Sequence, residues 1–263
     1  MLLLAAAALP ALLGGQPAPA GCVDVPAPKV NYRANVARAT SSPWIDNNAW
    51  RFVRRPDATY CIDAPGRQSS LAAAEAFAFG VTAYIKGAAD TAAFDRMIQF
   101  LRALPGFDAP ALVNAGIVDD GSERAAELMN LMMRRNLLFR AETKPDPRLS
   151  INVTKIEDLD PGKEAYRVRQ QIGDDRRLVR VYGTEVVIAR LTGDASKTRL
   201  HLLNYSGRTV NGVRVRVLGN YGAAEPHIFG APDAKLLDFV HGSGFAEFTV
   251  DALNEYAVID LLP

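Results

Sequence analysis

The feature that most constrains the fold of this chain is a change in hydrophobic period near residue 145. Before that point, short apolar runs alternate with segments of helical period, and after it the apolar residues recur at every second position. The strands predicted in the first part are residues 58–62, 81–85, 112–118 and 137–141. The sequence therefore predicts an α/β domain with an open, mostly parallel sheet and flanking helices, followed by a small antiparallel β-sandwich.

The helices predicted in the first part have core faces and recognisable ends. Residues 70–79 are rich in alanine, and Gly80 is suited to closing that helix because glycine readily adopts a left-handed C-cap. A second helix begins at Asp90 and ends before Pro105. Its apolar residues fall at i, i+3, i+4 and i+7, namely Phe94, Met97, Ile98 and Leu101. This stripe predicts a face packed into the core and not a cofactor site.

The strands predicted in the second part are residues 178–182, 186–191, 199–205, 213–218, 246–250 and 256–261. Within 213–217, valine and arginine alternate. The valines are expected to face a core and the arginines water, as in a sheet that is solvated on one side. Short strands at this spacing are typical of a β-sandwich.

The N-terminus resembles an export signal. Residues 1–13 are apolar apart from Pro10 and too short for a stable membrane anchor, and the small-x-small triplet at residues 18–20 fits a cleavage site. The alternative is a buried N-terminal helix. The predicted organisation is thus a signal peptide at 1–20, an α/β domain at 21–145, a connector at 146–177 and a β-sandwich at 178–263, with no transmembrane segment in the mature protein.

The chain has two cysteines, Cys22 and Cys61. In an oxidising compartment such a pair favours one disulfide, which would tie the mature N-terminus to the first strand region. A lipid anchor on Cys22 is the minority alternative. The three histidines are too scattered for a metal site, and we expect no metal. Location outside the cytoplasm, secreted or periplasmic, follows from the signal and the cysteines.

Charge and motifs exclude several classes of function. The chain has 30 basic and 29 acidic residues, so no net field would attract nucleic acid. The sequence contains no GxGxxG, P-loop or GxSxG pattern. We therefore expect no nucleotide or other cofactor and no nucleophile-elbow chemistry.

Acidic residues follow the strand predicted at 112–118, where an α/β sheet presents the carboxyl ends of its strands. Asp120 with Glu123 is expected to cap the following helix. Asp119 is not needed for the cap and is the better functional candidate. A third acidic residue, Glu75, lies on the alanine-rich helix, where the simpler interpretation is a solvent-facing side chain.

Both tryptophans of the chain fall in one polar loop. The candidate ligand-binding residues of this loop are Trp44, Asp46, Asn47, Asn48, Trp50 and Arg51. Sugars are bound by such mixtures, since an aromatic face meets the C–H side of the ring and polar groups meet the hydroxyls. The alternative is an ordered loop whose tryptophans fill the edge of the core.

Five segments carry a resemblance to a known class of proteins. They are residues 42–47, 71–77, 130–139, 200–205 and 256–261. Together they resemble the non-barrel regions of bacterial glycoside-hydrolase-type proteins, namely a glutamine-amidotransferase-like or β-galactosidase-trimerisation-like α/β domain and a C-terminal β-sandwich. A chain of this length has no room for the catalytic barrel as well, so the resemblance carries over no catalytic residue.

Three functions are consistent with these features. The first is a secreted, carbohydrate-associated binding or accessory protein with a saccharide ligand at the tryptophan loop and Asp119. The second is a glycan hydrolase that uses carboxylates from Asp46, Glu75 and Asp119, for which the separation of the carboxyl groups would be decisive. The third is a structural or partner-binding envelope protein.

Overall fold

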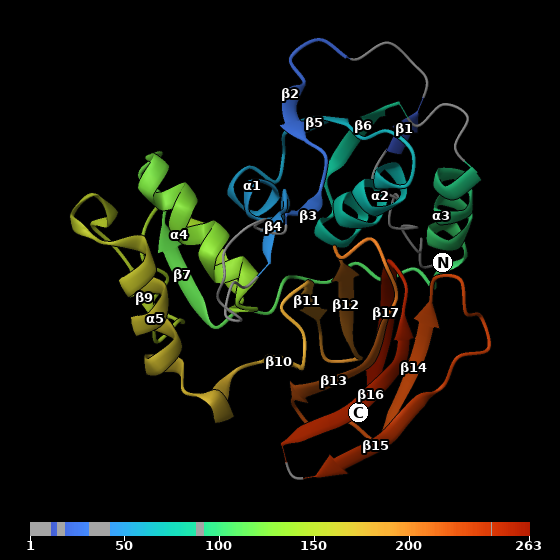
Figure 1. The fold of residues 1–263 in the computed structure, drawn as a ribbon. Helices are drawn as coiled ribbons and strands as arrows, with labels where there is room; N and C mark the ends of the chain where they lie inside the picture. The colour runs from blue at the N-terminus through green and yellow to red at the C-terminus, as the bar shows by residue number, and fades with distance from the viewer. Residues whose placement is uncertain (1–11, 15–18, 32–42, 88–91, 243) are drawn as a thin grey trace, which may run out of the picture.

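The computed structural model describes residues 12–14, 19–31, 43–87, 92–242 and 244–263. An α/β part lies against a β-rich part, as predicted (Figure 1). In the described part of the chain, no helix is long and apolar enough to cross a membrane.

The first parallel sheet has the strand order β1-β6-β5-β2. Its strands are β1 (Leu12–Gly14), β2 (Val23–Pro26), β5 (Thr59–Asp63) and β6 (Thr82–Lys86). Helix α2 (Gln68–Phe79) is the crossover between β5 and β6. Gly80 closes α2 at φ 68°, and its N–H reaches carbonyls of the last turn, so the predicted glycine cap is confirmed. Strand β1 falls within the predicted signal segment, of which residues 1–11 and 15–18 lie outside the described residues.

A second parallel sheet has the order β8-β7-β9, from β7 (Ala115–Val118), β8 (Phe139–Glu142) and β9 (Asn152–Val153). The predicted parallel strands therefore fall into two sheets and not one. The cause is the segment before β7, which is bound to the β-sandwich. Leu112 N–H donates to the carbonyl of Leu191, and Gly193 N–H donates to that of Pro110, which keeps β7 away from β6.

The remaining helices cover these sheets. They are α1 (Ala49–Arg54), α3 (Ala92–Ala103), α4 (Glu123–Arg134) and α5 (Pro161–Ile172). The predicted stripe on α3 is packed inward, with Phe94, Met97 and Leu101 buried. A short antiparallel pair, β3 (Lys29–Asn31) and β4 (Trp44–Asp46), precedes α1. The predicted connector contributes β9 and α5 to the α/β part, and α5 packs on α4.

The β-sandwich consists of two antiparallel sheets of four strands each in the part of the chain described. One sheet contains β10 (Val179–Tyr182), β13 (Val210–Leu218), β16 (Phe245–Leu253) and β15 (Leu236–Gly242). The other contains β11 (Val187–Gly193), β12 (Thr198–Asn204), β17 (Tyr256–Leu262) and β14 (Ala223–Ile228). On β13 the valines at 213, 215 and 217 are buried between the sheets, as predicted from the alternation. The edge strands β14 and β15 were not predicted, because Pro226 interrupts one and the other lacks alternation.

Cys22 and Cys61 form the predicted disulfide, with Cα atoms 5.7 Å apart. The bond ties the residue before β2 to β5, the strand with which β2 pairs. It therefore holds an edge strand in register.

Replacing Cys22 and Cys61 together by serine is expected to lower the free energy of unfolding by about 2–4 kcal/mol. The bond spans 39 residues, so its loss frees a long loop in the unfolded chain. Urea unfolding of the two proteins measures the change. Wild-type protein in a thiol reductant is the control and should match the variant. Equal unfolding midpoints for oxidised and reduced wild-type protein would contradict the expectation.

Helix α2 joins the two parts of the molecule. It packs on β6 on one side and on β12 on the other. A single buried cluster contains α2 residues together with Ile188, Leu203, Tyr205, Tyr256 and Val258 of the sandwich. The two domains therefore share a core.

Candidate functional site

The tryptophan loop is built into β4, a turn and α1. The Asp46 carboxylate accepts hydrogen bonds from Trp44 Nε1, at 2.9 Å, and from Asn31 Nδ2. Asn47 Nδ2 donates to Asn130 on α4 at 2.9 Å, and Asn48 Nδ2 donates to the carbonyl of Pro26 at 2.8 Å. Both asparagines are buried. Their amide groups hold the loop in place.

The aromatic and basic residues of the loop also have partners. The guanidinium of Arg134 lies 3.8 Å from the centre of the Trp44 ring. Trp50 packs partly buried against the core, with Arg51 stacked on it at 4.2 Å. Arg51 Nη1 donates to the backbone carbonyl of Asn47 at 3.2 Å. These are the contacts of an ordered loop, and a ligand at its six candidate residues stays a prediction.

Glu75 is fully buried, so its interpretation as a solvent-facing acid is wrong. Its Oε1 accepts hydrogen bonds from the backbone N–H groups of Asn48 and Ala49, at 2.7 and 3.2 Å, and from the Tyr205 hydroxyl, at 2.6 Å. Burial raises the pKa of Glu75 to about 7, although these hydrogen bonds oppose the rise. The carboxyl group thus binds the start of α1 and a sandwich tyrosine at once.

Asp119 forms a two-point ion pair with Arg54, with Nε–Oδ2 and Nη2–Oδ1 distances of 2.7 and 2.9 Å. The expected capping by Asp120 is wrong, because Ser122 is the N-cap of α4 and accepts from Ala125 N–H. Asp120 instead accepts from Ser122 N–H within the turn. Asp46, Glu75 and Asp119 therefore engage separate sets of partners.

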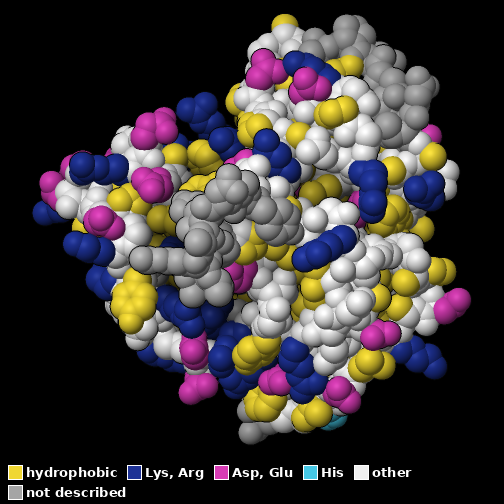
Figure 2. Space-filling model, in the orientation of Figure 1, with side chains coloured by type: hydrophobic (Ala, Val, Ile, Leu, Met, Phe, Trp, Pro, Cys, Tyr) yellow, Lys and Arg dark blue, Asp and Glu magenta, His cyan; other side chains and the backbone are white. Residues whose placement is uncertain are grey.

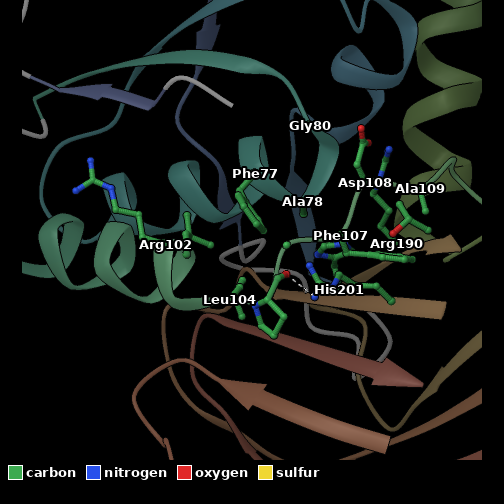
Figure 3. Close-up of a pocket in the computed structure, with 15 residues that line it drawn as sticks. Phe77, Ala78, Gly80, Arg102, Leu104, Phe107, Asp108, Ala109, Arg190 and His201 are labelled. Carbon is green, nitrogen blue, oxygen red and sulfur yellow. Dashed lines mark hydrogen bonds between the residues drawn. The ribbon is translucent and has the colours of Figure 1, made fainter. Parts of the chain in front are cut away.

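A cavity of about 420 Å³ lies between the domains (Figure 3). Its walls come from the end of α2, the end of α3 with the loop after it, and the sheet that contains β11 and β12. The aromatic lining residues are Phe77 and Phe107, and the polar ones include Asp108, Arg190, Thr192, Arg199 and His201. In Figure 3, Arg102 points away from the other labelled side chains.

The sheet forms the polar wall of this cavity because its strands alternate. Leu191, Leu200 and Ile259, one on each of three neighbouring strands, face the sandwich core. The residues next to them along each strand therefore point the other way, toward the α/β domain. Strand register places Arg190 opposite His201 and Arg199 opposite Asp260. The outer face of the sandwich is thus covered by the α/β domain and carries charged groups there.

Most of these polar groups are paired. Asp260 is 1% exposed and accepts from Arg199 at 2.6 and 2.7 Å and from Lys197 at 2.8 Å. Burial by itself would raise the pKa of Asp260, but these hydrogen bonds lower it below the ordinary value. His201 Nδ1 lies 2.6 Å from the Tyr256 hydroxyl. Burial, helped by the charges of Arg190 and Arg199, lowers the pKa of His201 to about 3, so the imidazole is neutral at physiological pH.

Arg190 is the exception on this wall. No hydrogen bond or ion pair joins its guanidinium to any residue within the described ranges, and its Nε atom is buried without a partner. The guanidinium stacks on the Phe79 ring at 4.5 Å. Burial lowers the pKa of Arg190 to about 10, which leaves it charged at neutral pH. The cavity wall therefore contains a charged side chain that makes no hydrogen bond or ion pair in the described part of the chain.

Sequence reasoning missed this site. Arg190 interrupts the apolar strand β11, and Arg199 and Asp260 occupy outward-facing positions of β12 and β17. In the sequence alone, this pattern is typical of a sheet face in contact with water. Only the position of α2 and the loop after α3 turns that face into a cavity wall. A charged residue within a strongly apolar strand was the available signal.

Comparison with known proteins gives a likeness in fold. No protein-family model matches the chain, and no curated protein matches it. The fold is similar to that of α-L-fucosidase isoenzyme 2 from Paenibacillus thiaminolyticus, with a TM-score of 0.59 and 8% sequence identity over 81% of this chain. The match spans 62% of the fucosidase chain, so this chain covers about three fifths of it.

Two α-amylase structures are also found, at TM-scores too low to carry an argument. The α-amylase from Anoxybacillus matches at a TM-score of 0.21, with 13% identity over 53% of this chain and 32% of its own. That from H. orenii matches at 0.20, with 9% identity over 57% and 40%. The fucosidase comparison thus shows a fold like that of part of the fucosidase chain.

Proposed function

We propose that this protein is a secreted carbohydrate-binding or accessory protein and that the cavity between its domains holds the saccharide. The observation that carries the proposal is Arg190, a charged side chain on the cavity wall whose Nε atom is buried and has no hydrogen-bond partner in the described part of the chain. A buried polar group without a partner is costly, and a ligand with acceptor oxygens would remove that cost.

The rest of the lining suits a sugar. A volume of about 420 Å³ falls in the usual range for small-ligand sites. Phe77 and Phe107 offer apolar surface to the C–H groups of a sugar ring, while Arg190 and Thr192 offer donors to its oxygens. The fold likeness to a protein named as a fucosidase supports the choice of a saccharide among small ligands.

Binding is favoured over cleavage by the carboxylates present. Among the described residues that line the cavity, Asp108 is the one carboxylate, whereas glycoside hydrolysis commonly uses two. Asp46, Glu75 and Asp119 have structural partners elsewhere. Export is proposed from the apolar N-terminal segment and from the disulfide, a bond that persists in oxidising compartments.

Changing Arg190 to glutamine is expected to weaken saccharide binding about tenfold or more, since a hydrogen bond to a charged group is worth about 1.5–3 kcal/mol. The same change should leave the melting temperature equal or higher, because it removes a desolvated charge without a counter-ion. A glycan array identifies the ligand, and titration calorimetry then compares the two proteins.

Two controls locate the site. Arg208→Gln removes a charge from an exposed turn of the sandwich and should bind like wild type. Trp44→Ala tests the ligand site predicted at the tryptophan loop, and unchanged binding in this variant would assign the ligand to the cavity. Loss of binding in Trp44→Ala with full binding in Arg190→Gln would place the ligand at the loop, and an array without any bound glycan would refute the carbohydrate proposal.

A further inference from the structure

A second cavity, of about 390 Å³, is lined by four arginines. We call it the arginine pocket and define it by Arg134, Arg135, Arg169 and Arg177. These residues come from the end of α4, from α5 and from the segment before β10. In Figure 2, dark blue side chains gather in the corresponding region, between the α4 and α5 part and the sandwich.

Part of this basic character has a structural role. Arg177 Nη2 donates to the carbonyls of Arg135 and Asn136, at 2.8 and 3.3 Å, and Arg135 Nη1 donates to that of Leu131 at 3.4 Å. These carbonyls lie at the end of α4, where basic groups are favourable. The contacts use some of the N–H donors but neutralise no charge.

Nearby carboxylates leave the charge incompletely balanced. Asp174 is shared by Arg169, Arg177 and Arg180 at 3.7 to 3.8 Å. Glu185 is the one carboxylate among the described residues that line the pocket. Within this described lining, four arginines thus stand against one carboxylate, and the lining has a net positive charge.

Arg177 indicates that the pocket takes a ligand. Its side chain is 10% exposed, and its Nε atom is buried with no hydrogen-bond partner among the described residues. Burial, and after it the charge of Arg169, lowers the pKa of both Arg135 and Arg177. The arginines repel one another in a partly desolvated space, which an anion would relieve.

We propose that the arginine pocket binds a tetrahedral oxyanion, the sulfate or phosphate ester group of a ligand. Guanidinium groups line the pocket from three elements, and a sulfate or phosphate ester group offers three acceptor oxygens, against two for a carboxylate. Trp44, stacked on Arg134, stands beside this site, and Pro43 forms part of its lining.

The test is thermal unfolding and titration calorimetry of the full chain with inorganic sulfate and inorganic phosphate, each compared with sodium chloride at equal ionic strength. The comparison with chloride removes general screening. The expected result is a saturable rise in melting temperature with sulfate or phosphate but not with chloride. Glucose 6-sulfate and glucose 6-phosphate, each compared with glucose, then distinguish the two sources of the anion.

The double variant Arg135→Gln/Arg169→Gln is expected to weaken binding of the anion about tenfold or more. Both side chains are exposed enough for the variant to fold, which its melting curve in chloride verifies. Arg208→Gln is the matched control, and Arg190→Gln should bind the anion normally, which separates this pocket from the cavity between the domains. Equal effects of sulfate, phosphate and chloride would overturn the proposal, as would unchanged anion affinity in the double variant.

Discussion

Replacing Glu75 by alanine is expected to lower the free energy of unfolding by about 3–5 kcal/mol. Three donors converge on Glu75 Oε1, namely two backbone N–H groups at the start of α1 and the Tyr205 hydroxyl. Alanine would leave all three unpaired in a site with no exposure. Urea unfolding of the two proteins measures the loss. A change below about 1 kcal/mol would contradict this account.

Glutamine at the same position separates hydrogen bonding from charge. Because the three donors share one oxygen, the glutamine carbonyl can accept them all, and Glu75→Gln should remain within about 1 kcal/mol of wild type at pH 5. Burial raises the pKa of Glu75 in the folded protein from its ordinary value of 4.5 to about 7. A raised carboxyl pKa gives stability that is fully present below the unfolded pKa and lost as pH rises to the folded one. Wild type should therefore lose about 3 kcal/mol between pH 4.5 and 7 from this group.

The glutamine variant should lack this loss and become the more stable protein above pH 7. Unfolding midpoints measured from pH 4.5 to 8.5 give both curves, and their difference isolates Glu75. Tyr205→Phe is a useful control, because it removes a hydrogen bond that holds the pKa of Glu75 down and should move the loss to higher pH. Parallel curves for wild type and Glu75→Gln would show that the carboxyl group does not titrate in this range.

Changing Asp260 to asparagine is expected to cost about 3–5 kcal/mol. Arg199 is 3% exposed, and its charge would remain buried with only the carbonyl of Pro105 and the new amide as partners. In wild type the pKa of Asp260 is lowered, so the stability it contributes is present at neutral pH and is lost as pH falls from the ordinary carboxyl pKa through the lower pKa of the folded protein.

Denaturant unfolding at pH 7 measures the effect of Asp260→Asn. The matched control is Asp24→Asn. It breaks an ion pair of similar length, 2.7 Å from Asp24 to Lys86, but the Asp24 side chain is 80% exposed. That variant should unfold close to wild type, since exposed pairs contribute little. Equal losses in the two variants would contradict the importance assigned to burial.

Local patterns predicted the elements that local chemistry decides. The alternation of valine and arginine at 213–217 correctly predicted that the valines of β13 face the core. Gly80 correctly predicted where α2 ends. The pairing of Cys22 with Cys61 followed from there being two cysteines in a chain that the sequence predicts to be exported. In each case the deciding interaction lies within a few residues or has one possible partner.

Contacts between distant segments decided the rest. The split into two parallel sheets depends on hydrogen bonds from residues 110–112 to β11, which no period in the sequence records. Glu75 looked exposed on an alanine-rich helix, because its partners lie 27 and 130 positions away. Arg190 has the phase of a solvated residue, and its position on a cavity wall follows from how the domains meet.

The burial of α2 on both sides has a consequence for any attempt to divide the chain. Ten of its residues are buried, and the sandwich covers the side that β6 leaves open. A fragment ending near residue 145 would expose an alanine-rich surface and would deprive Glu75 of its hydrogen bond from Tyr205. The isolated sandwich would expose Arg190, Arg199 and Asp260 on one face. We therefore expect limited proteolysis to yield no stable half-molecule, and the two domains to unfold as one unit.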